Sequence, residues 1–387
     1  MSSVQYQLKS DVPFGMFLSG GIDSSLITAQ AVNLSSVKVN TFSIGFEENS
    51  HNESEYAKAV SNHLGTNHHE FIVSYKDAIL LFDSIFEAYD EPNADSSFIP
   101  TMLVSKLAKK YVTVTLSGEG GDELFFGYGS YRWAKRFSNP MFNLIRRQLA
   151  FILKNMSSRY QRISKVLLTE DSDNLRSHIL SQEQYYFTTR EIEKLTFPEY
   201  NKPGLLMDLT NFEKQSVLAE IQNFSGTMVK ERSLSTMELQ ALFDIQYYLP
   251  DDLLTKVDRS SMLFSLETRV PYLDHRVVEF AINLSPDLKL HNHISKYILK
   301  QILYKYVPEK LFDRPKQGFA IPLNKWLKNE LKYLIDEYLN PDTIIATGVV
   351  KKEYVKDLLF DFQNGKDYLY NRIWLLIVLH KWFKDKL

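Results

Sequence analysis

Short apolar runs alternate with segments of helical periodicity over the first third of the chain. The runs are rich in Val, Ile, Leu and Phe and are typical of buried strands. They predict strands over residues 14–18, 39–46, 70–73 and 112–116. Between them, apolar residues recur at helical spacing and predict helices over residues 24–32, 53–64, 77–89 and 98–110. The alternation favours an α/β fold built on a mainly parallel sheet.

A serine- and glycine-rich turn, SGGIDSS at residues 19–25, joins the first expected strand to the first expected helix. Glycine lets the backbone turn tightly and approach an anion, and the N–H groups at a helix start favour negative charge. A carboxylate such as Asp23 fits beside phosphate only when a cation bridges the two, and magnesium prefers oxygen ligands of this kind. The turn therefore predicts a nucleotide-phosphate site with magnesium. The alternative is a corner in which the serines only cap the helix.

This loop differs from the two commoner glycine loops. Neither GxxxxGK[ST] nor GxGxxG occurs here, so neither a Walker-type site nor a dinucleotide site is predicted. SGGxDS instead resembles the pyrophosphate loop of ATP pyrophosphatases, which cleave ATP between the α- and β-phosphates.

A second polar turn, SGEGGDE at residues 117–123, follows the fourth expected strand. Surface turns rich in Gly and Asp are common, so on its own this turn is typical of a solvated loop. In an open parallel sheet, however, ligands bind outside the carboxyl ends of the strands, where the first loop also lies. This placement makes Asp122 a candidate second magnesium carboxylate beside Asp23, with Glu119 and Glu123 in the same turn.

The composition is that of a soluble enzyme rather than a nucleic-acid-binding or membrane-spanning protein. The chain has 387 residues, of which 44% are hydrophobic, so it can bury a large core. Its 45 Lys and Arg nearly balance its 47 Asp and Glu, which points to neither nucleic acid nor an anionic membrane overall, although local patches could still bind either. The sequence has no membrane-spanning run and no signal-peptide layout, so a cytoplasmic location is expected. The absence of cysteine excludes disulfides, thiolate zinc sites and a cysteine nucleophile.

Two further segments have plainer interpretations. Residues 131–169 contain nine Lys or Arg and no acid, with apolar residues at helical spacing. The favoured interpretation is the basic, solvated face of a helical insert, and the alternative is docking of a partner or polyanion. Asp95, Ser96 and Ser97 precede an amphipathic run and are typical of a helix cap.

Four ordered motifs resemble one family. They are SGGIDSS at 19–25, LSGEGGDELFFGY at 116–128, LETRVPYLDHRVVEFA at 266–281 and RPKQGFAIP at 314–322. Together they are similar to the synthetase half of glutamine-dependent asparagine synthetases, a family that includes the β-lactam synthetases. The resemblance runs with gaps from near Ser10 to the C-terminus.

The resemblance implies a parallel sheet of the adenine-nucleotide α-hydrolase (PP-loop ATP pyrophosphatase) type with a large helical part. It divides the chain into a nucleotide-binding portion over 1–129, a helical insert over 130–235 and a helical portion over 236–387 that completes the site. The implied activity is ATP-dependent amidation of aspartate through a β-aspartyl-AMP intermediate, with release of AMP and pyrophosphate.

The resemblance also assigns roles to individual residues. Pyrophosphate is expected at Ser19, Gly20, Gly21, Asp23, Ser24 and Ser25, and adenosine at Leu18, Ile44, Ser117 and Gly118. Asp23 and Asp122 would share magnesium. Glu119 matches a carboxylate that would take a proton from attacking ammonia, and Lys316 matches a lysine that would neutralise charge on the leaving pyrophosphate. The carboxylate substrate is expected at Glu123, Asp252, Lys256 and Arg259.

Some of these assignments leave alternatives. Lys256 and Arg259 lie one turn apart on a predicted helix, but the acidic group near them is either Asp251 or Asp252. Glu267 and Arg269 fit a structural ion pair behind the site slightly better than a binding role. β-Lactam synthetases carry a tyrosine at the position of Glu119, so Glu119 favours ammonia as the nucleophile.

The sequence departs from complete family members in its nitrogen source. Those enzymes begin with a glutaminase domain whose N-terminal cysteine attacks glutamine, whereas this chain starts shortly before its first expected strand and has no cysteine. The chain is therefore expected to be either a truncated gene product or a synthetase that takes ammonia from solution or from a separate glutaminase. Two other functions stay open: amidation of another carboxylate, such as a cell-surface sugar acid or a peptide, and a non-catalytic binding subunit.

Overall fold

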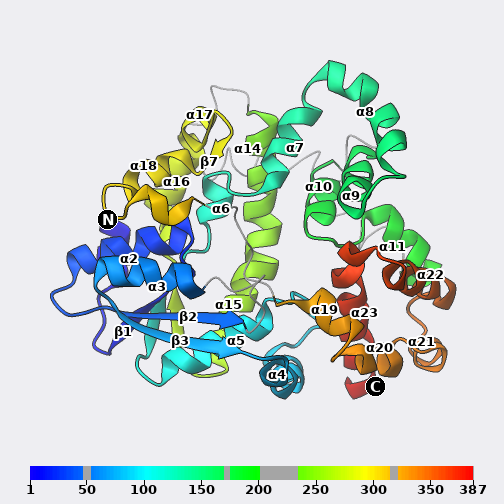
Figure 1. Ribbon diagram of the computed structural model, residues 1–387, viewed down its shortest axis with the longest axis horizontal. Coiled ribbons are helices and arrows are strands. Elements are labelled where there is room, and N and C mark those ends of the chain that lie inside the picture. The colour runs from blue at the N-terminus through cyan, green and yellow to red at the C-terminus, as the bar shows by residue number, and fades with distance from the viewer. Residues whose placement is uncertain (47–53, 170–174, 201–233, 314–320, 387) are drawn as a thin grey trace. The chain divides into compact units, whose positions relative to one another are not determined.

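The computed structural model describes residues 1–46, 54–169, 175–200, 234–313 and 321–386, which form two compact units (Figure 1). The first unit comprises Met1–Asp90, Asp95–Tyr128 and Asp244–Pro322, and the second comprises Glu91–Ala94, Gly129–Phe243 and Leu323–Leu387. Each unit therefore draws on segments that are distant in the sequence. The expected division into three consecutive parts stays a prediction beside these two units.

The first unit is built on a parallel sheet with the strand order β3-β2-β1-β4-β5. Its strands are β1 Phe14–Phe17, β2 Asn40–Phe46, β3 Asn67–Val73, β4 Val114–Leu116 and β5 Glu267–Arg269. The four predicted strands and the α/β class are confirmed, although β3 begins earlier than expected, at Asn67. The sequence does not predict β5, because its short run Glu-Thr-Arg carries no apolar signal.

The four helices expected around the sheet are also present. They are α2 Ile22–Leu34, α3 Ser54–Leu64, α4 Tyr75–Ala88 and α5 Phe98–Lys109. Because connections between parallel strands are right-handed, α2 and α3 cover one face of the sheet while α5 packs on β2 and β3 from the other (Figure 1). β4 lies on the opposite side of β1 from β2, so the winding of the chain reverses between β1 and β4.

Shorter elements complete the first unit around a continuous apolar core. Met16 and Leu116, on neighbouring strands, are fully buried and cluster with Leu26 of α2 and with Leu299. Burial of each such side chain contributes roughly 1.5–3 kcal/mol to stability. The remaining elements are α1 Ser2–Gln7, α6 Gly121–Leu124, a π-helix Asp244–Leu254, α15 Thr255–Met262, α16 His275–Asn283, α17 Pro286–Lys289, β6 Leu290–His291, β7 Ile294–Ser295 and α18 Tyr297–Leu303.

The second unit is helical in its described residues, apart from one isolated bridge between Thr196 and Val350. Its first helices are α7 Gly129–Phe137, α8 Pro140–Leu153, α9 Ser158–Leu167, α10 Leu175–Glu183, α11 Thr189–Leu195 and α14 Thr236–Phe243. Those of the C-terminal segment are α19 Leu323–Lys328, α20 Lys332–Tyr338, α21 Pro341–Thr347, α22 Lys352–Gln363 and α23 Tyr370–Lys386. None of the helices described in either unit has the length and apolar character needed to cross a bilayer.

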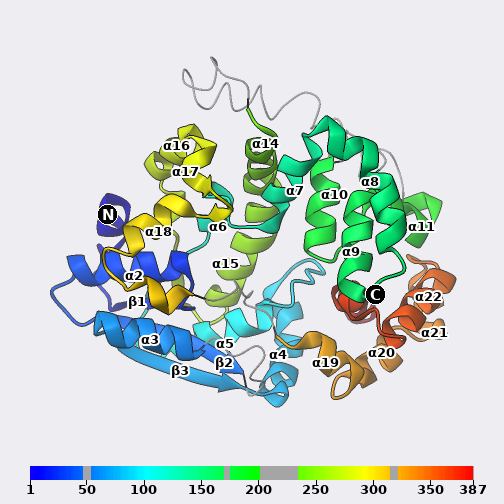
Figure 2. The same ribbon diagram turned by 45° about the horizontal axis from the view of Figure 1, so that its top comes forward.

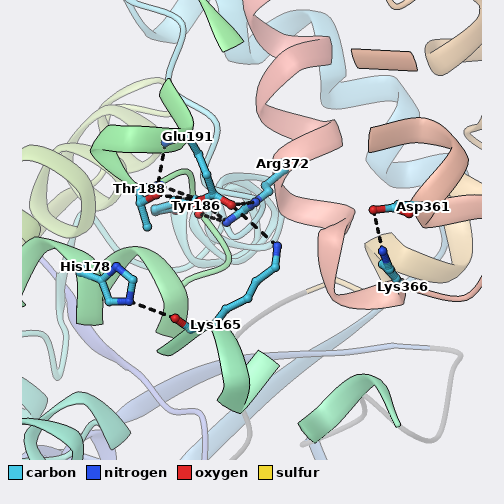
Figure 3. A network of polar contacts seen from close by, with 8 residues as sticks. All are labelled: Lys165, His178, Tyr186, Thr188, Glu191, Asp361, Lys366 and Arg372. Carbon is cyan, nitrogen blue, oxygen red and sulfur yellow. Dashed lines mark hydrogen bonds and ion pairs between the residues drawn. The ribbon is translucent and has the colours of Figure 1, made fainter. Parts of the chain in front are cut away.

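In the second unit, a buried ion pair joins helix α11 to the C-terminal helix α23 (Figure 3). Arg372 of α23 donates two hydrogen bonds to the carboxylate of Glu191 in α11, at 2.7 and 2.8 Å, and a third to the carbonyl of Tyr186. Glu191 also completes a capping box with Thr188 at the start of α11. Burial opposes ionisation of Glu191, but Arg372 and these donors outweigh it and lower the pKa of Glu191 to about 2.

We predict that Glu191→Gln destabilises the protein at neutral pH by about 3 kcal/mol, because it leaves the buried Arg372 guanidinium without its counter-charge. Since the folded pKa of Glu191 is below its ordinary value of 4.5, the stability from this pair is present above pH 4.5 and is lost as the pH falls toward 2. Urea unfolding at several pH values should therefore show the difference between wild type and variant shrinking in acid. Glu193→Gln, at an exposed position of the same helix, is the control, and a pH-independent difference would contradict the assignment.

Candidate functional site

Two polar loops meet where the winding of the sheet reverses. β1 and β4 are hydrogen-bonded neighbours, with Met16 opposite Leu116, so the loops that follow them leave the same edge of the sheet side by side. Such a reversal point is where open α/β sheets bind ligands. A Cβ on Gly118 would lie 3.0 Å from the backbone nitrogen of Ser24, and a Cβ on Gly121 would lie 2.6 Å from the Asp23 carboxylate. Only glycine lets the two loops approach this closely.

Its own hydroxyl groups hold the first loop in shape. Ser19 and Ser24 hydroxyls lie 3.0 Å apart, the backbone N–H of Ser19 donates to the Ser24 hydroxyl, and that of Gly21 donates to the Ser19 hydroxyl. Gly20 has a φ of +73°, and a side chain there would meet the backbone of Ala57 at 2.7 Å. α2 begins directly after its N-cap residue Gly21, which has no side chain that could cap the first N–H groups. The predicted phosphate loop thus has the backbone shape and the helix start that an anion requires.

A buried lysine, Lys296, joins the two loops. Its ammonium lies 2.7 Å from Oδ1 of Asp122 and also forms an ion pair with the Asp23 carboxylate. Lys296 has a left-handed backbone, with φ +54°, at the start of α18, and its N–H donates to the carbonyl of Phe125 at 3.1 Å. A Cβ on Gly127 would overlap both Asp122 and Lys296, so this position also needs glycine. We call Lys296, Asp23 and Asp122 the Lys296 cluster.

The Lys296 ammonium is itself the cation between the two carboxylates of the cluster. Burial by itself lowers the pKa of Lys296, but the carboxylates of Asp122 and Asp23 outweigh it and raise the pKa above its usual value. A permanent positive charge therefore sits between the two carboxylates that the sequence assigns to magnesium. The described residues contain no group of three or more His, Cys, Asp or Glu that could bind a metal by themselves. Two carboxylates fit magnesium only if phosphate and water complete its oxygen shell, as they do beside nucleotides.

The other acids of the second loop have different environments. Glu119 is half-buried and accepts a hydrogen bond from the Ser117 hydroxyl. Glu123 is fully buried and accepts one from the Tyr128 hydroxyl at 2.5 Å. Burial, reinforced by the Asp122 carboxylate, raises the pKa of Glu123 to about 7. Of these two acids, Glu119 is partly exposed, whereas Glu123 is hydrogen-bonded inside the protein, and its expected contact with substrate stays a prediction.

Lys256 forms a second buried ion pair in the same unit. Its ammonium donates to Asp95 at 2.9 Å and to the Ser97 hydroxyl at 2.8 Å. Burial raises the pKa of Asp95, but Lys256 and the Ser97 donors outweigh it and hold the pKa below its usual range. The pKa of Lys256 is raised, because Asp95, Asp252 and Glu119 together outweigh the effect of burial. Asp252 and Glu119 therefore lie close enough to act on the same ammonium.

This pair adds to the interpretation of Asp95, Ser96 and Ser97 as a helix cap, in which Asp95 accepts a hydrogen bond from the backbone N–H of Ser97 at 2.8 Å. α5 starts after Ser97, but the Ser97 side chain makes no capping bond. Its hydroxyl donates to Asp95 and accepts from Lys256 instead. The sequence pattern of Asp95, Ser96 and Ser97 correctly predicts the start of α5, but it does not predict the ion pair with Lys256.

The other predicted residues lie in several places. Arg259 is on the surface, 3.2 Å from the exposed carboxylate of Asp90. Asp251 is exposed, whereas Asp252 is half-buried and its charge acts on Lys256. Asp252 is therefore the better candidate for the acidic group beside Lys256. The predicted ion pair between Glu267 and Arg269 is present at 2.6 Å on β5. Lys316 lies outside the described residues.

The predicted adenosine contacts lie along the strand ends. Leu18 and Ile44 are buried, and the backbone N–H groups of Leu18 and Ser117 donate to the carbonyls of Phe42 and Arg269. Contacts of a ligand with Leu18 and Ser117 would therefore fall to other backbone atoms, chiefly the carbonyl oxygens. These roles stay predictions.

Comparison with known proteins identifies the kind of chain that carries this site. A family model described as "Asparagine synthase" matches residues 1–384. The chain is 32% identical over 382 residues to "Asparagine synthetase [glutamine-hydrolyzing] 1" of Bacillus subtilis, covering 98% of this chain and 57% of that protein. It is 31% identical over 385 residues to "Putative asparagine synthetase [glutamine-hydrolyzing]" of Mycobacterium bovis, covering 98% and 56%. It is 24% identical over 382 residues to "Amidase chyE" of Penicillium rubens, covering 90% and 55%. The chain thus spans little more than half the length of these relatives.

We predict that Lys296→Met lowers the free energy of unfolding by about 3 kcal/mol, because it leaves two facing carboxylates without the buried cation between them. Magnesium chloride should raise the thermal midpoint of this variant more than that of wild type, since the metal replaces the lost charge. Differential scanning calorimetry with and without the salt measures both effects. Lys305→Met, at an exposed position shortly after α18, is the control, and an unchanged midpoint for Lys296→Met would show that the cluster adds no stability.

Proposed function

The chain belongs to the asparagine synthase family, and from this membership we propose that it is a carbon–nitrogen ligase that converts ATP to AMP and pyrophosphate. The proposed substrate is aspartate, amidated to asparagine through a β-aspartyl-AMP intermediate. The Lys296 cluster carries the proposal, because it brings two carboxylates and a cation to the meeting point of the two loops. A reaction that consumes ATP and aspartate also fits the expected cytoplasmic location.

In the first proposed step, the substrate carboxylate oxygen attacks the α-phosphorus of ATP, and the bond from that phosphorus to the bridging oxygen of pyrophosphate breaks. The loop from Ser19 to Ser25 and the start of α2 would hold the phosphates through backbone N–H groups and hydroxyls. Asp23 and Asp122 would hold magnesium, which supplies positive charge to the phosphate oxygens. Lys316, by the motif that contains it, would add charge at the leaving pyrophosphate.

In the second proposed step, ammonia attacks the acyl carbon, AMP leaves with the electrons of the carbon–oxygen bond, and the nitrogen loses a proton. Glu119 is the proposed acceptor of that proton, because it is half-buried and is oriented by Ser117. Lys256 would hold the α-carboxylate of the substrate. Within the described residues, Asp95 and Ser97 are the hydrogen-bond partners of its ammonium, so one of its three N–H donors remains for a ligand.

Ammonia is the proposed nitrogen source. The glutaminase reaction of the family needs a thiolate nucleophile, and this sequence has no cysteine. Where glutamine is the ultimate donor, we propose that a glutaminase outside these 387 residues supplies the ammonia.

A different carboxylate is the second candidate substrate. The relative from Penicillium rubens is named an amidase rather than an asparagine synthetase, and aspartate is not part of that name. The same adenylation chemistry applies to any acid that reaches Lys256 and Glu119.

We predict that isotope exchange between pyrophosphate and ATP depends on magnesium and on the correct acid, and a panel with aspartate and other carboxylic acids identifies that acid. Glu119→Gln should retain exchange but lose amide formation by about 100-fold, since it removes only the proton acceptor. Asp122→Asn should lose both activities. Asp258→Asn, at an exposed position of α15, is the control. Full activity in Asp122→Asn, or equal loss of both activities in Glu119→Gln, would contradict these roles.

We predict that the purified chain forms amide with ammonium salts but not with glutamine. The rate should rise with pH as ammonium loses its proton, because ammonia carries the lone pair that attacks. The measurement is amide formation with each donor, together with glutamate release from glutamine. Glutamate release by protein shown to be free of other enzymes would overturn the proposed nitrogen source.

A further inference from the structure

Helix α8 exposes most of its large apolar residues, although Phe142 on its inner side packs against Phe137. Six large apolar side chains of this helix are between 37% and 77% exposed, namely Met141, Leu144, Ile145, Leu149, Phe151 and Ile152. At about 100° per residue they fall within an arc of roughly 160°, so they lie on one side of the helix, which the exposed Gln148 shares. The only buried residue of α8 is Ala150. This set of six is the outer face of α8.

Polar contacts fix α8 in this orientation. The Arg146 guanidinium points inward and donates to the carbonyls of Leu167 and Thr169, at 2.6 and 2.7 Å. These carbonyls lie at and just beyond the C-terminal end of α9, where helix carbonyls lack partners and a cation is favoured. Ser164 of α9 donates to the carbonyl of Ala150 at 2.7 Å. Figure 2 shows α8 and α9 side by side, and rotating α8 to bury its leucines would break these bonds.

The favoured interpretation of this region as a basic, solvated face agrees with the exposed Arg147 and Lys154 but does not account for the exposed apolar residues of α8. An amphipathic surface helix normally turns its charged residues to water and its apolar residues to the core. Here Arg146 lies on the inner side with Phe142 and Ala150, while the six residues of the outer face point to solvent. In proteins, a large exposed apolar patch marks an interaction site.

Basic residues border the outer face. Arg147 and Lys154 are exposed, and on the helix they adjoin Leu144 and Phe151 at spacings of three and four residues. Residues 131–169 contain nine Lys or Arg and no Asp or Glu, so no carboxylate of this segment would repel an anionic surface. Apolar side chains flanked by Lys and Arg are the pattern of helices that lie in a membrane interface.

We propose that the outer face of α8 docks on the surface of an anionic phospholipid membrane. The apolar side chains would enter the boundary of the acyl chains, and Arg147 and Lys154 would reach the headgroup phosphates with their long side chains. A second copy of the chain fits this face less well, because a twofold contact would bring two acid-free basic segments together. Binding would be peripheral, in keeping with the lack of a spanning helix in the described ranges. This inference does not rest on the proposed reaction.

The test is cosedimentation of the full chain with vesicles of phosphatidylcholine, with or without phosphatidylglycerol. Wild type should bind the anionic vesicles, and added salt should weaken that binding. Leu144→Ser with Phe151→Ser should weaken it by about tenfold or more, because two large side chains no longer leave water. Arg147→Glu with Lys154→Glu should weaken binding to anionic vesicles in particular. Phe360→Ser and Lys356→Glu, at exposed positions of α22 in the same unit, are the matched controls.

Three results would overturn the proposal. The first is no binding of wild type to anionic vesicles, and the second is equal binding by the α8 variants and wild type. The third is a wild-type dimer that Leu144→Ser with Phe151→Ser converts to a monomer, because the face would then join two copies. Circular dichroism shows whether the variants remain folded, and pyrophosphate exchange, followed separately, shows whether the proposed reaction stands on its own.

Discussion

The buried ammonium of Lys296 between Asp23 and Asp122 is the interaction on which the rest of the first unit depends. It connects the loop after β1, the loop after β4 and the start of α18, three segments that no local contact would bring together. Moving three charges out of water is unfavourable, so the arrangement is stable only because each charge has an opposite partner at hydrogen-bond distance. The surrounding glycines follow from this constraint, since a side chain at Gly121 or Gly127 would occupy the space of the ions.

The same principle recurs around Lys256. Asp95 and Ser97 accept hydrogen bonds from its ammonium, while the charges of Asp252 and Glu119 help to raise its pKa. Of these two buried cations, Lys296 lies at the loops proposed to bind phosphate, and Lys256 lies near the acid proposed to accept a proton. Fixed charges of this kind need no reorganisation when a reaction develops charge, which is the usual basis of catalysis on anionic substrates. The geometry and the family membership therefore support the same chemistry.

The second unit uses buried charge in a different way. Arg372 with Glu191, and Arg146 with the carbonyls at the end of α9, hold helices in one orientation and leave no room for a ligand between the paired groups. Arg146 lies on the inner side of α8 with Phe142 and Ala150, and the outer face of α8 lies opposite them. The packing of the helical unit thus leaves exposed the surface proposed to meet a membrane, separately from the chemistry of the sheet.

The sequence by itself determined the α/β class, four strands, four helices and both polar loops, because strand and helix periods and glycine-rich turns are local properties of the chain. It also placed Asp23, Asp122 and Glu119 at strand ends, where parallel sheets collect functional groups. Only the tertiary structure decided that Lys296 lies between the two aspartates, because Lys296 is 273 positions away from Asp23 in the sequence. The same is true of Lys256 and Asp95, at a separation of 161 positions, and of the outward face of α8. Periodicity shows that a helix has an apolar side, but the contacts made by its other side decide which way that side points.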